Sequence, residues 1–266
     1  MKRQDRIGRV VRSLAAAVLL LGAAAGSRVL AADKLGVVLM HGKHGLPEQL
    51  ALYDAPLASL GILTARPEMC WSRHRIYDRP YLDCLREVDD AIANLKARGA
   101  TAIVVGGMSL GGNGALGYGA HHQGLKGILT LAPAHFPEFL SRRPDIEQAL
   151  ERARQLLANG HGGEKVEFPD INQNEEIKVV ATPAAYISFL GADSPSVMPR
   201  NAATLSAPLL LVAGIEDRSQ RGESYVFGRA PGNPLNRYVT VHSNHFDTPA
   251  AGREAAIAWL RELQKR

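Results

Sequence analysis

The sequence predicts an α/β fold with a doubly wound, mostly parallel sheet of about six strands. From Leu35 onward, short and nearly continuous apolar runs alternate with helical patterns, and such runs are typical of strands buried on both faces. Regular alternation of strands and helices favours parallel strands joined by crossover helices. The predicted strands are residues 36–40, 62–65, 102–105, 127–131, 209–213 and 238–241.

Two helices have the clearest patterns. In residues 81–98, apolar side chains recur every three to four positions, and Gly99 is placed to end the helix. The last helix is predicted to start near Gly252 and carries Ile257, Leu260 and Leu263 on one face.

The first 31 residues are predicted to be a signal peptide. Five basic residues precede an apolar run from Leu14 to Ala25, and Val29-Leu30-Ala31 has the small residues of a cleavage site. The run is shorter than the roughly 20 residues that a membrane-spanning helix needs. We therefore expect a mature chain of residues 32–266, periplasmic or secreted and without stable membrane insertion, with a retained anchor as the alternative.

Charge and cysteines narrow the class of protein. The whole chain has a net charge of +5, and residues 1–31 alone carry six basic residues and one acidic residue, so the mature chain is near neutral. No basic patch interleaved with aromatic residues is present, and we expect no nucleic-acid partner.

Cys70 and Cys84 could form a disulfide in an exported protein, or Cys84 could simply pack on its helix. No C-x-x-C pattern points to a metal.

A long insertion separates the fourth predicted strand from the fifth. It is expected to form an ordered cap over residues 134–207, with an amphipathic helix at 145–158 and a polar turn at Asn172-Gln173-Asn174. The apolar face of that helix, which includes Leu150 and Leu157, must bury against the rim of the sheet or against an acyl chain in the pocket. We expect this cap to control the size of the substrate.

Two glycine motifs overlap after the third strand. Gly107 to Gly111 fits G-x-S-x-G, and Gly112 to Gly117 fits G-x-G-x-x-G, the dinucleotide-binding pattern. A dinucleotide site needs its glycines directly after the strand and a carboxylate about 20 residues on. Gly112 comes too late, and the next strand ends in Ala132-Pro133 without an acid. No dinucleotide cofactor is therefore expected, and these glycines are expected to allow close packing.

Later strand ends carry the residues that a nucleophilic serine requires. Ser109 needs a base and an acid that orients this base, in the order serine, acid, histidine for this kind of turn. Asp217 follows the fifth strand and His245 follows the sixth. Glu216 and His242 compete with them, but position favours Asp217 and His245, and the ring of His242 is expected to pack.

With the glycine-flanked turn His41-Gly42-Lys43-His44-Gly45 after the first strand, the chain resembles the α/β-hydrolase superfamily from Leu35 to about Leu263. The resemblance implies a triad of Ser109, His245 and Asp217. It also implies oxyanion donors from the backbone N–H groups of Leu110 and Lys43. Two features depart from the pattern. Met108 stands where many lipases and esterases carry histidine, and the two strands that open many members' sheets are missing.

The resemblance implies an esterase-like serine hydrolase that cleaves a carboxylic ester of a small or medium acyl substrate, without cofactor or metal. A peptidase or thioesterase of the same fold remains open, as does a non-catalytic exported binding protein. His41 is expected to orient its turn. The side chains of Lys43 and His44 are expected to be solvated, with contact to an acidic substrate as the alternative. Six aromatic residues near the loops could line a pocket or pack in the core: Trp71, Tyr77, Phe136, Phe139, Tyr186 and Phe189.

Overall fold

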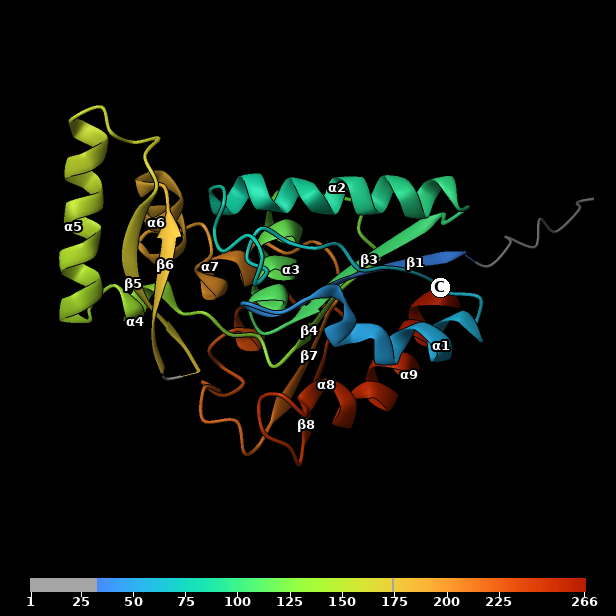
Figure 1. The fold of residues 1–266 in the computed structure, drawn as a ribbon. Coiled ribbons are helices and arrows are strands. Elements are labelled where there is room, and N and C mark those ends of the chain that lie inside the picture. Colours follow the sequence, from blue (N-terminus) through green and yellow to red (C-terminus); the bar gives the residue numbers. More distant parts are fainter. Residues whose placement is uncertain (1–32, 174) are drawn as a thin grey trace, which may run out of the picture. The chain divides into compact units, whose positions relative to one another are not determined.

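The computed structural model describes residues 33–173 and 175–266, so the predicted signal peptide lies outside the described residues. A parallel six-stranded sheet forms the centre, with strand order β2-β1-β3-β4-β7-β8 (Figure 1). The doubly wound parallel sheet predicted from the sequence is confirmed. Its strands are β1 (Leu35–Met40), β2 (Leu63–Ala65), β3 (Ala102–Met108), β4 (Gly127–Leu131), β7 (Leu209–Gly214) and β8 (Arg237–Val241).

Burial differs between the centre and the edges of the sheet. Residues of β1, β4 and β7 are all buried, and β3 is buried from Ile103 onward. The edge strands β2 and β8 are only partly buried, so the expectation of burial on both faces is wrong for them. Each edge strand has a neighbour on one side only, which leaves its outer side accessible.

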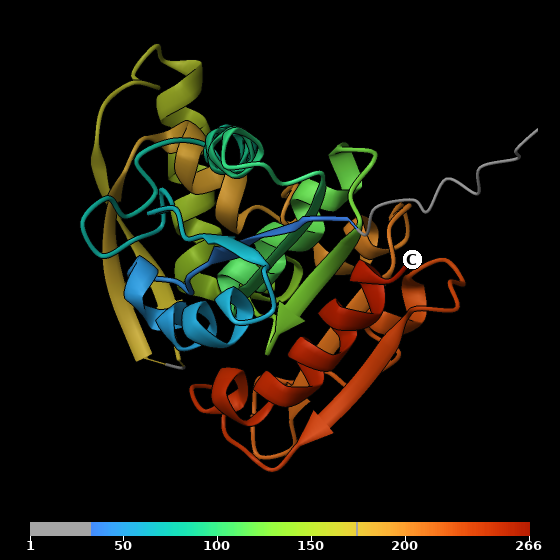
Figure 2. The ribbon, with the colours of Figure 1, turned by 90° about the vertical axis from the view of Figure 1, so that its right-hand side faces the viewer.

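Helices cover both faces of the sheet (Figures 1 and 2). Val38 and Met40 face the side of α2 (Tyr81–Ala97) and α3 (Leu110–His121). Val37 and Leu39 face the opposite core. The elements on that side are η1 (Pro47–Tyr53), α1 (Asp54–Ala58) and α9 (Arg253–Gln264). Helix α8 (Thr248–Ala251) adjoins them, since the Tyr53 hydroxyl donates to the Pro249 carbonyl. Alternation along each strand thus supplies two separate apolar cores.

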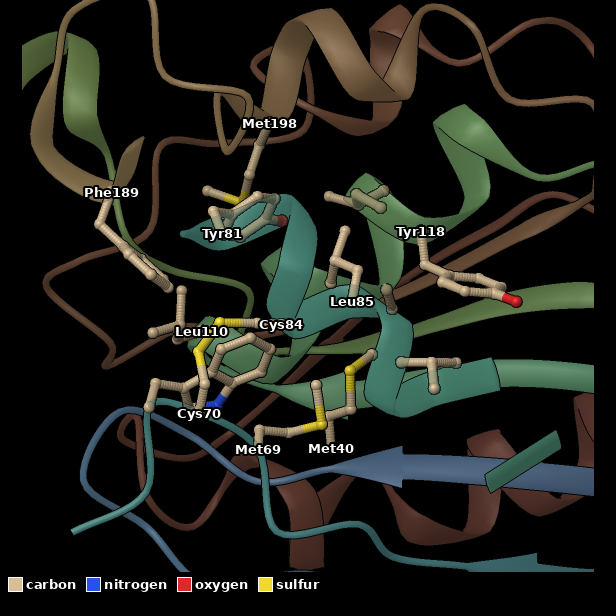
Figure 3. Close-up of a cluster of buried hydrophobic side chains, with 14 of the residues drawn as sticks. Met40, Met69, Cys70, Tyr81, Cys84, Leu85, Leu110, Tyr118, Phe189 and Met198 are labelled. Carbon is tan, nitrogen blue, oxygen red and sulfur yellow. A yellow bond between two sulfur atoms is a disulfide. The ribbon is translucent and has the colours of Figure 1, made fainter. Parts of the chain in front are cut away.

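The predicted helix at 81–98 is observed as α2, and Gly99 follows it with a φ of +95°. A disulfide joins Cys84 on this helix to Cys70 in the loop after β2 (Figure 3). Cys84 is therefore both bonded and buried on its helix. The glycines of α3 serve close packing, as expected: a Cβ on Gly114 would lie 2.9 Å from the Trp71 ring.

The segment between β4 and β7 is ordered where the structure describes it. It contains a β-hairpin and four helices: α4 (Pro137–Leu140), α5 (Pro144–Ala158), β5 (Val166–Asn172), β6 (Glu175–Ala181), α6 (Pro183–Leu190) and α7 (Met198–Ala202). The helix predicted at 145–158 is α5. Of the predicted polar turn, Asn172 is the last residue of β5 and Gln173 follows it, whereas Asn174 lies outside the described residues. The short helix η2 (Phe227–Arg229) lies between β7 and β8. No helix among residues 33–173 and 175–266 has the length and apolar character needed to cross a membrane.

Candidate active site

Ser109 occupies the sharp turn between β3 and α3. Its φ of 54° and ψ of −121° lie in a region that L-residues rarely adopt. Its N–H donates to the Leu131 carbonyl at 3.0 Å, and its carbonyl accepts from the N–H groups of Asn113 and Ala134. A Cβ on Gly111 would overlap the Met40 carbonyl, so the tight turn requires glycine there. The backbone thus holds Ser109 in a strained conformation, as G-x-S-x-G predicts.

His245 and Asp217 form a buried pair. Nδ1 of His245 lies 2.6 Å from Oδ2 of Asp217, and the two residues are 5% and 7% exposed. Since Nδ1–H donates to the carboxylate, Nε2 carries the free lone pair of the neutral ring. Nε2 is buried and has no hydrogen-bond partner among the described residues, so Ser109 Oγ is not bonded to it in this structure.

Asp217 is also held by residues that follow it. Ser219 donates to Oδ1 from its N–H at 2.9 Å and from its hydroxyl at 2.6 Å, and Gln220 donates to Oδ2 at 3.1 Å. Burial raises the pKa of Asp217, but the hydrogen bonds from His245 and Ser219 outweigh it and hold the pKa at about 2. The sequence interpretation missed Ser219, although a polar residue two positions after an aspartate is typical of an Asx turn.

The competing residues do not join this pair. Glu216 is exposed and lines the cavity without a hydrogen bond to His245 among the described residues. His242 is exposed, so the expectation that its ring packs is wrong. It lies just beyond the edge strand β8, which leaves its side chain in solvent.

Leu110 and Lys43 both lie beside Ser109. Leu110 is the first residue of α3, where backbone N–H groups have no partner within the helix. The N–H of Lys43 makes no hydrogen bond to any described residue, whereas Gly42 donates to Gln49 and His44 donates to the Trp71 carbonyl. A Cβ on Gly42 would lie 3.2 Å from the Ser109 Cβ, so the loop touches the serine. Both amides are available to a ligand.

His41 stabilises the loop after β1 through hydrogen bonds of its buried ring. It is fully buried, its Nδ1–H donates to the Gly42 carbonyl at 2.8 Å, and its Nε2 accepts from the Met69 N–H at 3.0 Å. Burial lowers the pKa of His41, which keeps the ring neutral as these two bonds require. The predicted role in orienting the turn is confirmed.

The side chain of Lys43 is not solvated, contrary to expectation. It is 7% exposed, and its Nζ donates to both carboxylate oxygens of Asp170 and to the Ile171 carbonyl. The His44 side chain is half-buried, and burial together with the charge of Lys43 lowers its pKa. The partner of Lys43 could not be predicted because Asp170 lies 127 residues away in the chain.

Ser109, His245 and Asp217 line one cavity of about 390 Å³. Its apolar wall comes from the cap, chiefly from Phe136, Phe139, Leu140 and Ile171, and the Arg221 guanidinium lies over Phe139, 4.4 Å from the ring centroid. The other lining residues are Lys43, Leu110, Ala134, His135, Asn172, Gln173, Glu216, Arg218, Ser219, Asn244 and Phe246.

The cap contributes differently from the prediction. No residue of α5 lines this cavity. Leu150 is buried where α5 packs against α6 and β5, and Leu157 is 40% exposed. The expected contact with an acyl chain is therefore wrong, and the cover of this helix face comes from other elements of the cap and not from the rim of the sheet. The short helix α4 and residues 171–173 at the end of β5 line the cavity instead.

Of the six aromatic residues considered from the sequence, two line the cavity and four pack. Phe136 and Phe139 belong to its wall. The other four are fully buried: Trp71, Tyr77, Tyr186 and Phe189. Across the described part of the chain, no three His, Cys, Asp or Glu side chains gather closely enough to hold a metal ion.

Solved structures resemble this chain at low sequence identity. Est1E from Butyrivibrio proteoclasticus, solved with ferulic acid bound, has a TM-score of 0.63 and 18% identity over 88% of this chain and 91% of its own. A monoacylglycerol lipase from Paleococcus ferrophilus has a TM-score of 0.61 and 16% identity over 86% and 94%. Proline iminopeptidase from Mycobacterium smegmatis has a TM-score of 0.53 and 14% identity over 87% and 90%.

The sequence matches no protein-family model and no curated protein. At these identities the structural likeness concerns the fold, and it extends over more than four fifths of each chain. Together with the six parallel strands and the turn at Ser109, it shows that this chain has the α/β-hydrolase fold, which it shares at low identity with these esterase and lipase structures.

Proposed function

We propose that this protein is a serine hydrolase that cleaves a carboxylic ester of a small or medium acyl substrate. One observation carries the proposal: Ser109, on its strained turn, lines the same cavity as His245, whose ring is held by the buried carboxylate of Asp217 at 2.6 Å. A nucleophile, a base and an orienting acid are the parts that acyl transfer by serine needs.

In the proposed reaction, Ser109 Oγ turns toward Nε2 of His245 and attacks the ester carbonyl as the imidazole takes its proton. The N–H groups of Leu110 and Lys43 stabilise the negative charge that forms on the carbonyl oxygen. Asp217 stabilises the imidazolium, and His245 then protonates the leaving alcohol. Water attacks the acyl-enzyme by the same steps, which releases the acid and restores Ser109.

The lining of the cavity supports the substrate class. Phe136, Phe139 and Leu140 offer apolar surface beside the serine, and a cavity of about 390 Å³ lies in the range of small-ligand sites. Binding of ferulic acid to Est1E is consistent with a compact acyl group. The likeness to proline iminopeptidase keeps a peptidase as the second candidate. We also propose that the protein is exported, which the signal-like segment and the disulfide support.

Covalent labelling tests the proposal directly. A fluorophosphonate probe is expected to label the wild-type protein and not Ser109→Ala, while the thermal transitions of the two agree. Hydrolysis of a short-chain ester is expected to disappear with the label. An unlabelled wild-type protein would instead indicate a binding protein that retains the fold. A panel of esters, thioesters and aminoacyl amides then separates the esterase from the peptidase.

A further inference from the structure

A buried ionic cluster joins the loop beside Ser109 to the cap. All three N–H bonds of the Lys43 ammonium are used: two on Asp170, at 3.1 and 2.9 Å, and one on the Ile171 carbonyl, at 2.9 Å. Asp170, whose side chain is fully buried, also accepts from the Tyr77 hydroxyl at 2.9 Å and from the Ile171 N–H at 2.7 Å. Every hydrogen-bonding group of the ion pair therefore has a partner.

Three separate segments meet in this cluster. Lys43 belongs to the loop after β1, Asp170 to strand β5 of the cap hairpin, and Tyr77 to the loop closed by the disulfide. Tyr77 is itself fixed, since its ring stacks on Phe189 with centroids 4.1 Å apart. The three segments are thus locked to one another at the edge of the cavity, which both Lys43 and Ile171 line.

Stability alone does not account for a buried ion pair at this position. Removing two charges from water carries a large desolvation cost, and well-packed apolar residues at such a position often give equal or greater stability. What an ion pair adds is a defined geometry. Here the defined element is the backbone of Lys43, whose N–H is one of the two amides available beside Ser109.

We propose that Asp170 is a positioning residue for the oxyanion site: by holding the Lys43 ammonium, it fixes the Lys43 N–H toward the carbonyl oxygen of the substrate. The inference rests on the proposed function. The same carboxylate also anchors the end of strand β5 that lines the cavity, so it links the cap to the loop that contains Lys43. Lys43 acts through its backbone, and its charge is not available to a substrate.

The test compares Asp170→Asn with Glu167→Gln. Glu167 lies on the same hairpin and forms an exposed ion pair with Lys178, so its loss should leave kcat unchanged. Removing an oxyanion donor outright costs about 10²–10³-fold in rate, so displacing one should lower kcat of Asp170→Asn about 10- to 100-fold with little change in KM. A trifluoromethyl ketone, which places an oxyanion in the site when Ser109 adds to it, should lose affinity in parallel with kcat/KM. Binding of the product acid should change little.

A double variant, Lys43→Met with Asp170→Leu, separates positioning from folding because it leaves no buried charge. We expect it to regain thermal stability relative to Asp170→Asn while kcat stays low. If kcat recovers with stability, or if Asp170→Asn lowers only the thermal transition, Asp170 is structural and the inference fails. If Ser109→Ala still hydrolyses the ester, the proposed function fails whatever Asp170 does.

Discussion

His245 and Asp217 are 28 residues apart in the chain, yet Nδ1 and Oδ2 lie 2.6 Å apart in a buried site at the ends of two adjacent strands. Strands β7 and β8 run parallel, so the loops that follow them meet at one edge of the sheet. Because His245 and Asp217 form this pair, we expect their replacement to lower activity far more than replacement of His242 or Glu216, the other histidine and acid in these loops.

His245→Ala is expected to lower kcat/KM by about 10⁴-fold or more, because the base and the nucleophile act as a unit. Asp217→Asn is expected to lower kcat by up to about 10⁴-fold, since the imidazole loses the carboxylate that orients it. Steady-state kinetics on a short-chain ester measure both.

His242→Ala and Glu216→Gln are the matched controls, since both side chains are exposed and neither forms the pair. They should retain most of the activity. If His242→Ala proves as damaging as His245→Ala, the assignment of the base is wrong.

The lowered pKa of Asp217 predicts that the free energy of unfolding decreases in acid. Although burial alone would raise its pKa, hydrogen bonds from His245 and Ser219 lower it from 3.8 to about 2, so the folded protein binds this proton less tightly than the unfolded chain. The carboxylate therefore stabilises the fold at pH values above 3.8, and this contribution is lost as the pH falls toward 2.

Denaturant unfolding of the wild type and Asp217→Asn at about pH 5 and about pH 2.5 tests this linkage. The difference in unfolding free energy between the two proteins should shrink at the lower pH. A difference that stays constant would show that the pKa of Asp217 is not lowered by folding.

The sheet could be predicted because its central strands are nearly continuous apolar runs. The sharp turn at Ser109 could be predicted because Gly107 and Gly111 flank the serine directly after a buried strand. The Lys43–Asp170 pair could not be predicted, since the two residues are 127 positions apart and the glycine motif that contains Lys43 says nothing about the partner of its side chain. One signal was present nonetheless. Phe168 and Asp170 occupy the buried positions of β5, and an aspartate on the buried face of a strand requires a partner.

The wrong prediction that α5 contacts an acyl chain has a similar cause. An amphipathic pattern shows that Leu150 is buried but not what covers it, and α6 supplies that cover. Phe139 faces the cavity from a helix of only four residues, α4, which is too short to have a recognisable period.

The disulfide predicts a measurable loss of stability on reduction. Free-thiol counting under denaturing, non-reducing conditions should find no thiol, because Cys70 and Cys84 are bonded. Cross-linking a loop of this size contributes about 3 kcal/mol in the chain-entropy model, so Cys84→Ser should lower the unfolding free energy by roughly that amount.

The proposed export makes a separate prediction about the N-terminus of the mature protein. N-terminal sequencing of protein purified from the native host is expected to begin near Ala32. An intact Met1 on a membrane-bound protein would support the retained anchor, and two free thiols would contradict the disulfide.

Substrate choice is expected to depend on α4 rather than on α5. Phe139 lines the cavity and supports the Arg221 guanidinium, so Phe139→Ala removes apolar surface that an acyl chain would contact. We expect this variant to change the ranking of kcat/KM among esters of increasing acyl length, with the largest loss on the medium chains and the smallest on acetate. Each buried methylene contributes about 0.8 kcal/mol, which sets the size of the change expected per carbon.

Leu150→Ala is the control for this prediction, because Leu150 is buried in the cap without lining the cavity. It should lower the unfolding free energy by about 2–5 kcal/mol, as for other buried leucines, and leave the ranking of acyl lengths as in the wild type. If Leu150→Ala reorders the substrates and Phe139→Ala does not, the acyl chain lies along α5 after all. If Phe139→Ala lowers activity equally on every ester, α4 supports the fold of the cap without selecting the substrate.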